Sequence, residues 1–389
     1  MRVLAFGTYD ARMHPRIAIL IEGLRAHGLR VDECNAPLGV NTSDRVTMLR
    51  QPWRVPGLLA RIGSRWVGLT LDARRFPTPD VVLVGYLGHF DVVLARRIFR
   101  HSTILLDHLV SAADTATDRG VTARGMLRLL RRLDRTAVRS ADVVVLDTEE
   151  HRALVEPSGA EEIVVISLGA PQAWFVAGAQ PRQAIAARAV DRALAVEPAP
   201  DPPLRVVFFG LYTPLQGAPV IGEALRLLAD APIEVTMIGH GQDLGRTLEA
   251  AGGAPNVTWV RWVEGAELPH VIASHDVCLG IFGVGAKAQR VVPNKVFQGL
   301  AAGCVVVTSD TPPQRRALGD AALYVTPDDP QALADAIREL AADRDRVRAL
   351  RERGREAAEQ RMTAYAVTAP LVQRLRERVA EHPAASGSS

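Results

Sequence analysis

Short runs of valine, isoleucine and leucine alternate along most of this chain with longer amphipathic stretches. Such alternation is typical of parallel α/β sheets, whose strands are buried on both faces and joined by helices. The pattern starts over in the second half. The strands expected are residues 2–6, 81–84, 103–106, 143–146 and 163–166, then 205–209, 234–238, 257–260, 277–281, 304–308 and 322–325. We therefore predict an α/β protein with two doubly wound domains.

Length and a change in composition indicate the domain limits. A chain of 389 residues is too long for one ordinary core. Between the two halves lies a stretch rich in Ala, Pro and Gln, which ends in a proline cluster that continues neither helix nor strand. The predicted parts are a first domain over 1–176, a linker over 177–203, a second domain over 204–362, a C-terminal helix over 363–381 and a disordered tail over 382–389. Ligands of such domains bind at the carboxyl ends of the strands.

Composition excludes several classes of protein. With 48% hydrophobic and 23% charged residues, the chain is typical of a soluble globular protein. No apolar run approaches the ~20 residues of a membrane span, and we expect no signal peptide before the first strand. The three cysteines have no metal-ligand spacing and are predicted to be buried thiols in a reducing compartment. A net charge of +3 is too small to indicate nucleic acid, and a cytoplasmic location is predicted.

Positive charge is concentrated in two segments of the first half. Residues 45–75 and 119–139 each carry seven arginines against one acidic residue, Asp72 or Asp134. On a helix, five arginines of the second segment fall on one stripe: Arg124, Arg128, Arg131, Arg135 and Arg139. The stripe is either a solvated helix face or a contact for anionic lipid headgroups or a phosphate-bearing acceptor.

The chain contains only two lysines, Lys287 and Lys295, and both lie in one glycine-rich segment of the second half. An ammonium ion suits phosphate as a compact charge, whereas guanidinium favours a planar, two-pronged partner. Pro293 stands where a helix begins, Gly303 closes that helix, and Lys295 shares a helix face with Gln298. We expect exposed lysines that either bind phosphate or are simply solvated.

Glycine turns follow two strands of the second half. Strand 205–209 runs into residues 210–217 and then a helix, so the turn either offers free amides to an anion or is a plain tight turn. Residues 238–241 (Ile-Gly-His-Gly) end another strand, but they are not on the first strand of their domain, which argues against a dinucleotide fingerprint. A third strand end, residues 259–263, offers a rim for a base, although a core position is expected for at least one of its two tryptophans.

The order of these segments resembles the retaining, nucleotide-sugar-dependent glycosyltransferases of the GT-B fold, especially the group of bacterial mannosyl- and N-acetylglucosaminyltransferases. Ile238–Gly241 corresponds to the family's Ile-Gly-x-Gly element, and Pro293–Gly303 to its Pro-x-Lys-x-x-Glu-x-x-Ala-x-Gly element. Weaker matches in the first half are the opening strand, residues 141–148 and residues 164–175. The resemblance implies two Rossmann-like domains facing a cleft, with the C-terminal helix crossing back onto the first domain.

The resemblance also implies site residues. The implied donor-binding residues are Gly210, Tyr212, Thr213, Gln216, Gly239, Gly241, Val263, Arg290 and Gln298. The implied catalytic residues are His108, which contacts the donor sugar, and Lys287 and Lys295, which balance the departing diphosphate. Asp10, His14 and Arg16 are expected on the acceptor side. No metal ion or other cofactor is implied.

Three positions depart from the family's pattern. Two glutamates of the family correspond to Arg290 and Gln298, and a lysine corresponds to Gln216. Glutamine still hydrogen-bonds a ribose diol, but arginine cannot replace a carboxylate toward the donor sugar. Two alternatives therefore stay open: a nucleotide-sugar epimerase of the same fold, and a catalytically inactive partner subunit that binds sugar or nucleotide.

The predicted function is transfer of a hexosyl group from a nucleotide-diphosphate sugar to a hydroxyl acceptor, with retention of configuration. The predicted acceptor is either a glycolipid or polysaccharide intermediate, which can be lipid-linked, or a natural product. The arginine-rich segments favour peripheral contact with an anionic membrane at its inner face. No nucleic acid is expected as a partner.

Overall fold

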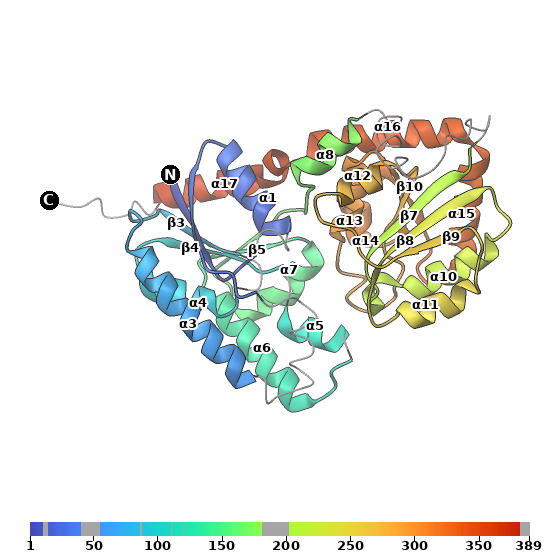
Figure 1. Cartoon of the computed structure of the whole chain (residues 1–389). Helices are drawn as coiled ribbons and strands as arrows, with labels where there is room; N and C mark the ends of the chain where they lie inside the picture. The colour runs from blue at the N-terminus through green and yellow to red at the C-terminus, as the bar shows by residue number, and fades with distance from the viewer. Residues whose placement is uncertain are drawn as a thin grey trace. The chain divides into compact units, whose positions relative to one another are not determined.

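The computed structural model describes residues 1–10, 15–39, 55–85, 88–109, 111–118, 120–180 and 202–381. It divides into two compact units, one formed by Met1–Ser167 with Ala364–Ser389 and the other by Leu168–Thr363. Each unit contains one six-stranded sheet in which all neighbouring strands are parallel, so the predicted pair of doubly wound α/β domains is confirmed (Figure 1). Most of the predicted linker and the predicted tail lie outside the described residues.

The sheet of the first unit has the strand order β2-β1-β3-β4-β5-β6. Its strands are β1 (Arg2–Gly7), β2 (Arg30–Asn35), β3 (Val81–Val84), β4 (Thr103–Asp107), β5 (Val143–Leu146) and β6 (Glu162–Val165). Strand β2 was not predicted. It is an edge strand in which only Val31 and Cys34 are buried, and it therefore lacks the continuous apolar run of the central strands.

Alternate side chains of each strand divide the core of the first unit into two layers. Val3 and Ala5 pack with the helices α1 (Pro15–Ala26) and α17 (Ala364–Glu381). Leu4 and Phe6 pack in the opposite layer. The helices of that layer are α3 (Val55–Ala73), α4 (Asp91–Ile98), α6 (Arg124–Arg139) and α7 (Glu149–Val155). Helices thus cover both faces of the sheet, and α5 (Ala112–Asp118) packs against α6 (Figure 1).

The last helix of the described chain returns to the first unit, as predicted. Helix α17 packs against α1, where a Cβ on Gly23 would lie 2.3 Å from the carbonyl oxygen of Ala364. Arg378 holds the other end of the helix through an ion pair with Glu162 at 3.1 Å. The second unit begins at Leu168, whereas the sequence predicts the first boundary after residue 176.

The sheet of the second unit has the order β12-β11-β10-β7-β8-β9. If β7 is numbered as strand 1 and the sheet is read from its β9 edge, this order is 3-2-1-4-5-6, which is the order of the Rossmann fold. Its topological switch point lies between β7 and β10. The six strands are β7 (Leu204–Leu211), β8 (Ile233–His240), β9 (Val257–Val260), β10 (Val277–Leu279), β11 (Val305–Ser309) and β12 (Ala322–Val325). All six were predicted from the sequence.

Both faces of the second sheet are also buried. Val206 and Phe208 pack with α10 (Ala218–Leu227) and α15 (Pro330–Ala342), whereas Phe209, on the other face, stacks on Trp174 of α8 (Gln172–Gly178). The other helices are α11 (Leu244–Ala251), α12 (Leu268–Ala273), α13 (Asn294–Ala301), α14 (Pro312–Leu318) and α16 (Arg344–Arg361). Among the described residues, no helix is both long and apolar enough to span a bilayer.

Candidate functional site

Three predicted donor-site glycines lie together where β7 and β8 end. Gly210, Gly239 and Gly241 have φ values of +142°, +128° and +156°, a region that side chains rarely adopt. A Cβ on Gly239 would lie 1.9 Å from the carbonyl oxygen of Gly210, and one on Gly241 would lie 2.5 Å from that of Tyr212. Glycine is required here because the two strand ends approach each other too closely for any side chain.

The turn that follows β7 uses its own amides. Tyr212 donates its N–H to the carbonyl of His240, Thr213 to Leu211, Gln216 to Thr213 and Gly217 to Pro214. The sequence allowed free amides that could face an anion, but these four amides already donate to carbonyl groups of β7, β8 and the turn. A second loop closes over the turn, since the N–H of Phe282 donates to the carbonyl of Gln216 at 3.0 Å.

Lys295 supplies the positive charge at this switch point. Helix α13 begins after Pro293 and ends before Gly303, which has a φ of +76°, as predicted. Lys295 is only 5% exposed, so the expectation of an exposed lysine is wrong. Its ammonium lies 3.6 Å above the ring of Phe208 and 3.2 Å from where a Cβ of Gly210 would be. The structure therefore joins the lysine segment and the first glycine turn, which are about 85 residues apart in sequence.

The ammonium of Lys295 has no hydrogen-bond partner among the described residues. Burial lowers the pKa of this side chain to about 7. Three more buried polar atoms in the turn after β7 and in α13 also lack a hydrogen-bond partner within the described chain: Gln216 Oε1, Tyr212 Oη and Asn294 Oδ1. Since buried polar groups in proteins are nearly always hydrogen-bonded, such a group of unsatisfied atoms indicates a ligand site. Asn294 stands between Pro293 and Lys295 and is not among the predicted site residues.

The other predicted donor residues, and the predicted catalytic Lys287, lie in the turn after β7, on α13, on the loop before α13 and beyond β9. Thr213 is buried in the turn, and Gln298, on the next turn of α13 after Lys295, is 7% exposed. Lys287 and Arg290 are half-buried on the loop before α13, and both have interactions of their own. Val263 is half-buried beyond the end of β9.

A cavity of about 570 Å³ opens beside the end of β8. Gly239 and Gly241 line it, together with Trp259 and Arg261 of the predicted rim. Trp262, the other tryptophan of that rim, is 59% exposed. The unsatisfied Lys295 and this cavity therefore lie at the carboxyl edge of the same sheet, at β7 and β8.

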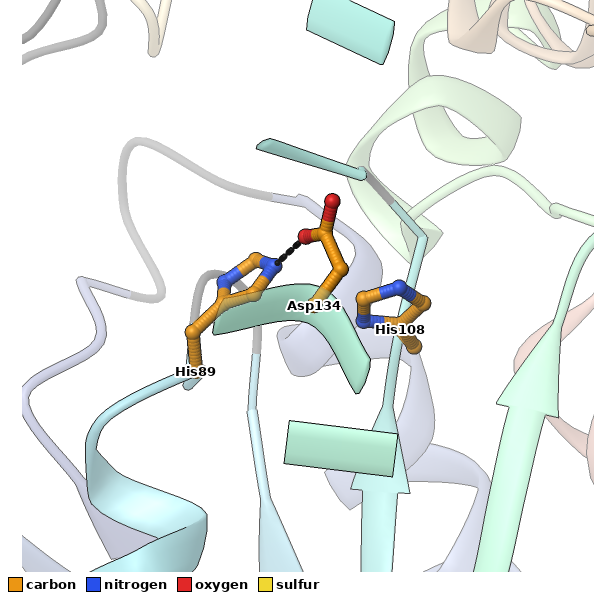
Figure 2. Close-up of side chains that lie close together, drawn as sticks. All are labelled: His89, His108 and Asp134. Atoms are coloured by element: carbon orange, nitrogen blue, oxygen red, sulfur yellow. Dashed lines mark hydrogen bonds and ion pairs between the residues drawn. The ribbon is translucent and has the colours of Figure 1, made fainter. Parts of the chain in front are cut away.

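The first unit contains a second polar cluster, formed by His89, His108 and Asp134 (Figure 2). His108 follows β4 and is 4% exposed, and its ring meets that of His89 edge-on at 5.1 Å. His89 Nε2 lies 2.9 Å from Asp134 Oδ1 of α6. Asp134 also accepts hydrogen bonds from the Ser111 hydroxyl and from the amides of Ala112 and Ala113 at the start of α5.

The surroundings of this cluster determine its charges. Burial, together with the neighbouring His89, lowers the pKa of His108 to about 3, so the imidazole is neutral at pH 7. Burial raises the pKa of Asp134, but the hydrogen bonds from His89 and from the two amides outweigh it and bring the pKa to about 2. His108 can therefore hydrogen-bond a neutral hydroxyl and does not act as a general acid near neutrality. The sequence pointed to His108 but not to His89.

The ligand atoms of His89, His108 and Asp134 lie within 4.8 Å of one another and are of types that zinc accepts. The four hydrogen bonds that Asp134 accepts from His89, Ser111, Ala112 and Ala113 satisfy its carboxylate without an ion. We therefore interpret the cluster as a hydrogen-bonded support for the loop after β4.

Arg16 has a different role from the predicted one. Its side chain is 1% exposed and lies between Asp107, at 3.2 Å, and the carbonyls of Ile166 and Ser167. It therefore ties α1 to the ends of β4 and β6 and has no exposed surface with which to contact an acceptor. Asp10 is half-buried beyond β1 and has an interaction of its own, and His14 lies outside the described residues.

Comparisons with known proteins agree with this architecture. Residues 203–343 match the family model described as "Glycosyl transferases group 1". No curated protein sequence matches the chain. Sucrose-phosphate synthase from Thermosynechococcus elongatus is similar in structure, with a TM-score of 0.70 and 14% identity over 98% of this chain and 100% of the other.

Two further solved structures share the fold. HepE from Anabaena, solved with UDP and glucose, has a TM-score of 0.68 at 14% identity, covering 97% of this chain and 100% of the other. The trehalose 6-phosphate synthase of Burkholderia multivorans has a TM-score of 0.63 at 14% identity, covering 100% and 98%. The chain thus has the GT-B fold, and its second unit contains the match to the glycosyl transferases of group 1.

Proposed function

We propose that this protein is a glycosyltransferase that uses a nucleotide-diphosphate sugar as its donor. The observation that carries the proposal is the buried ammonium of Lys295, without a hydrogen-bond partner among the described residues, against the Gly210 turn. This point lies at the switch point of a Rossmann sheet and within residues 203–343, the span of the family match. An anionic diphosphate is the ligand that would satisfy such a cation. HepE, which has the same fold, was solved with UDP and with UDP-glucose.

The reaction exchanges one bond at the anomeric carbon of a hexose. The bond from that carbon to the diphosphate oxygen breaks, and its electron pair leaves with the diphosphate. The acceptor oxygen bonds to the same carbon, with retention, and its proton passes to the departing diphosphate or to water. Lys295 stabilises the charge that develops on the leaving group, with Lys287 as a second cation. The neutral His108 is the proposed hydrogen-bond partner of a donor-sugar hydroxyl, and no metal ion or other cofactor is required.

Product analysis tests this proposal. The purified protein is incubated in EDTA with a panel of nucleotide sugars and hydroxyl acceptors, and products are identified by mass spectrometry and by the configuration of the new bond. A glycosylated acceptor with the donor's anomeric configuration supports the proposal. Conversion of the donor without an acceptor would instead indicate an epimerase, and no conversion with intact nucleotide binding would indicate an inactive partner subunit.

Gln298 is the proposed partner of the donor ribose. Replacing it with alanine is expected to weaken binding of both the donor and the free nucleoside diphosphate, because the diol loses a hydrogen-bonding amide. A donor with 2′-deoxyribose should bind the wild-type protein weakly and lose little more in the Gln298→Ala variant. Isothermal titration calorimetry of the four combinations measures the coupling. A full additional loss with the deoxy donor would contradict the assignment.

The acceptor is proposed to be met by the first unit, at a cytoplasmic membrane surface if it is lipid-linked. Arg124, Arg128, Arg131 and Arg135 are exposed on α6 and have no acidic partner among the described residues, and Leu129 beside them is 62% exposed. Such a basic helix face suits anionic lipid.

Sedimentation with vesicles that contain anionic lipid tests this contact. Binding is expected at low salt and should fall as salt is added, since exposed charges are screened beyond about 8–10 Å at physiological ionic strength. Replacing Arg128, Arg131 and Arg135 with serine should abolish sedimentation and leave donor binding intact. If the wild-type protein stays in the supernatant at low salt, the acceptor is a soluble molecule such as a natural product.

A further inference from the structure

A second cavity, of about 350 Å³, lies within the first unit between α5, α6 and α7. This volume falls in the range of small-molecule sites, which is about 300–1,000 Å³. The polar side chains of its wall include His108, Ser111, Asp114, Arg131, Asp134 and Arg135. The cavity therefore connects the proposed catalytic histidine with two arginines of the stripe on α6.

The groups available to a ligand in this cavity are cationic or neutral donors. Arg131 and Arg135 lie one turn apart on α6 and have no acidic partner among the described residues. His108 is 4% exposed and lines the same cavity. A neutral imidazole that lines a cavity can donate or accept a hydrogen bond toward a bound ligand.

The two acidic groups of the wall are already engaged. Asp134 accepts hydrogen bonds from His89, from Ser111 and from two amides. Asp114 has an interaction of its own, and its backbone N–H donates a hydrogen bond to the Ser111 hydroxyl. What remains free is a pair of guanidinium groups, which prefer ligands with several anionic oxygens in fixed geometry.

We propose that this cavity binds a phosphate group carried by the acceptor, with Arg131 and Arg135 as its cationic partners. The proposal rests on the proposed function, because it assigns the acceptor class of that transferase. A soluble sugar phosphate and a phosphate-containing lipid headgroup offer the same chemistry to these residues, and the experiment separates them.

The test measures acceptor binding without donor. Titration calorimetry compares glucose 6-phosphate with glucose and with inorganic phosphate as probes, for the wild-type protein and the Arg131→Gln/Arg135→Gln variant. The wild-type protein should bind glucose 6-phosphate, and the variant should bind it at least tenfold more weakly, since two charge-assisted hydrogen-bond donors are lost. Arg128→Gln/Arg132→Gln is the matched control, because it removes the same charge from the same helix at residues that do not line the cavity.

A second arm uses vesicles of phosphatidylglycerol and of phosphatidylcholine. If the headgroup supplies the phosphate, sedimentation with phosphatidylglycerol falls further in the cavity variant than in the control, and glucose 6-phosphate does not bind. Equal losses in the two double variants, in both arms, would overturn the proposal, because charge alone would then explain the binding. UDP titration separates this inference from the proposed function. If UDP binds but the cavity variant and the control variant bind the phosphate probes equally, only this inference is rejected. If UDP does not bind, the proposed donor site is rejected.

Discussion

Replacing Lys295 with methionine is expected to lower turnover by about 10²–10³-fold, the effect of removing one positioned electrostatic group. The ammonium lies against the Gly210 turn, and the described chain offers it no hydrogen-bonding partner. The departing diphosphate would therefore lose its nearest counter-charge. Methionine keeps most of the buried side-chain volume, so that kinetics rather than folding should respond. Single-turnover rates with a saturating donor measure the effect, and a rate near that of the wild-type protein would reject the assignment.

Lys287→Met is the matched control, since these are the two lysines of the chain. Lys287 is half-buried on its loop and already has an interaction of its own. Its removal should reduce turnover much less than that of Lys295. If the two variants lose activity equally, the charge of the whole loop matters rather than the position of one ammonium.

Stability should respond to the Lys295 substitution in a way that depends on pH. Burial lowers the pKa of Lys295 from 10.5 to about 7, so between these values the unfolded chain binds a proton that the folded chain has released. The folded state therefore gains stability as pH rises through this window, and below about pH 7 the cost of the buried charge is fully present. In urea unfolding of the ligand-free protein, the gain in the free energy of unfolding from Lys295→Met should thus be largest at pH 7 and below and should shrink toward pH 10.

Nucleotide binding should reverse the shift. A bound diphosphate favours the charged ammonium and raises its pKa, so the protein should take up a proton when UDP binds near pH 8. Calorimetric titrations in buffers of different ionisation enthalpy detect this uptake, which should vanish in Lys295→Met. Uptake that persists in the variant would assign the proton to another group.

The fold was largely predictable because its central strands are continuous apolar runs. Val277–Leu279 and Val305–Ser309 are buried along their whole length, which leaves no alternative to a parallel sheet covered on both faces. Strand β2 escaped prediction because an edge strand buries only some of its residues. The return of α17 rests on complementary contacts at Gly23 and Glu162, which a single sequence does not reveal.

The candidate site was predictable in its segments but not in its contacts. Glycine spacing and the position of Pro293 indicated where a ligand lies, because they reflect local backbone geometry. Burial of Lys295 and the pairing of Arg16 with Asp107 depend on residues far away in sequence. The hydrogen bonds from Ala112 and Ala113 to Asp134 were not predictable either, because Asp134 lies among arginines in the sequence and its partners are more than 20 residues away.

Gly239→Ala is expected to be the most disruptive single methyl addition at the proposed donor site. The new Cβ would lie 1.9 Å from the carbonyl oxygen of Gly210, and the φ of +128° is itself unfavourable for alanine. Backbone atoms cannot move aside as a flexible side chain can, so β7 and β8 would have to separate at their ends. Overpacking and backbone strain together predict a loss of about 2–5 kcal/mol in the free energy of unfolding of the second unit.

Gly245→Ala provides the control for this substitution. Gly245 lies in α11, six residues further along the chain, and a Cβ added there would meet nothing within 4 Å. Alanine should leave the stability unchanged or raise it by up to about 1 kcal/mol, because it favours the helix. Urea unfolding and UDP titration of both variants give the comparison. Gly239→Ala should unfold at lower urea and bind UDP at least tenfold more weakly, since the Gly210 turn against Lys295 is displaced. Wild-type behaviour of Gly239→Ala would mean that the close approach of the two strand ends is not needed for the site.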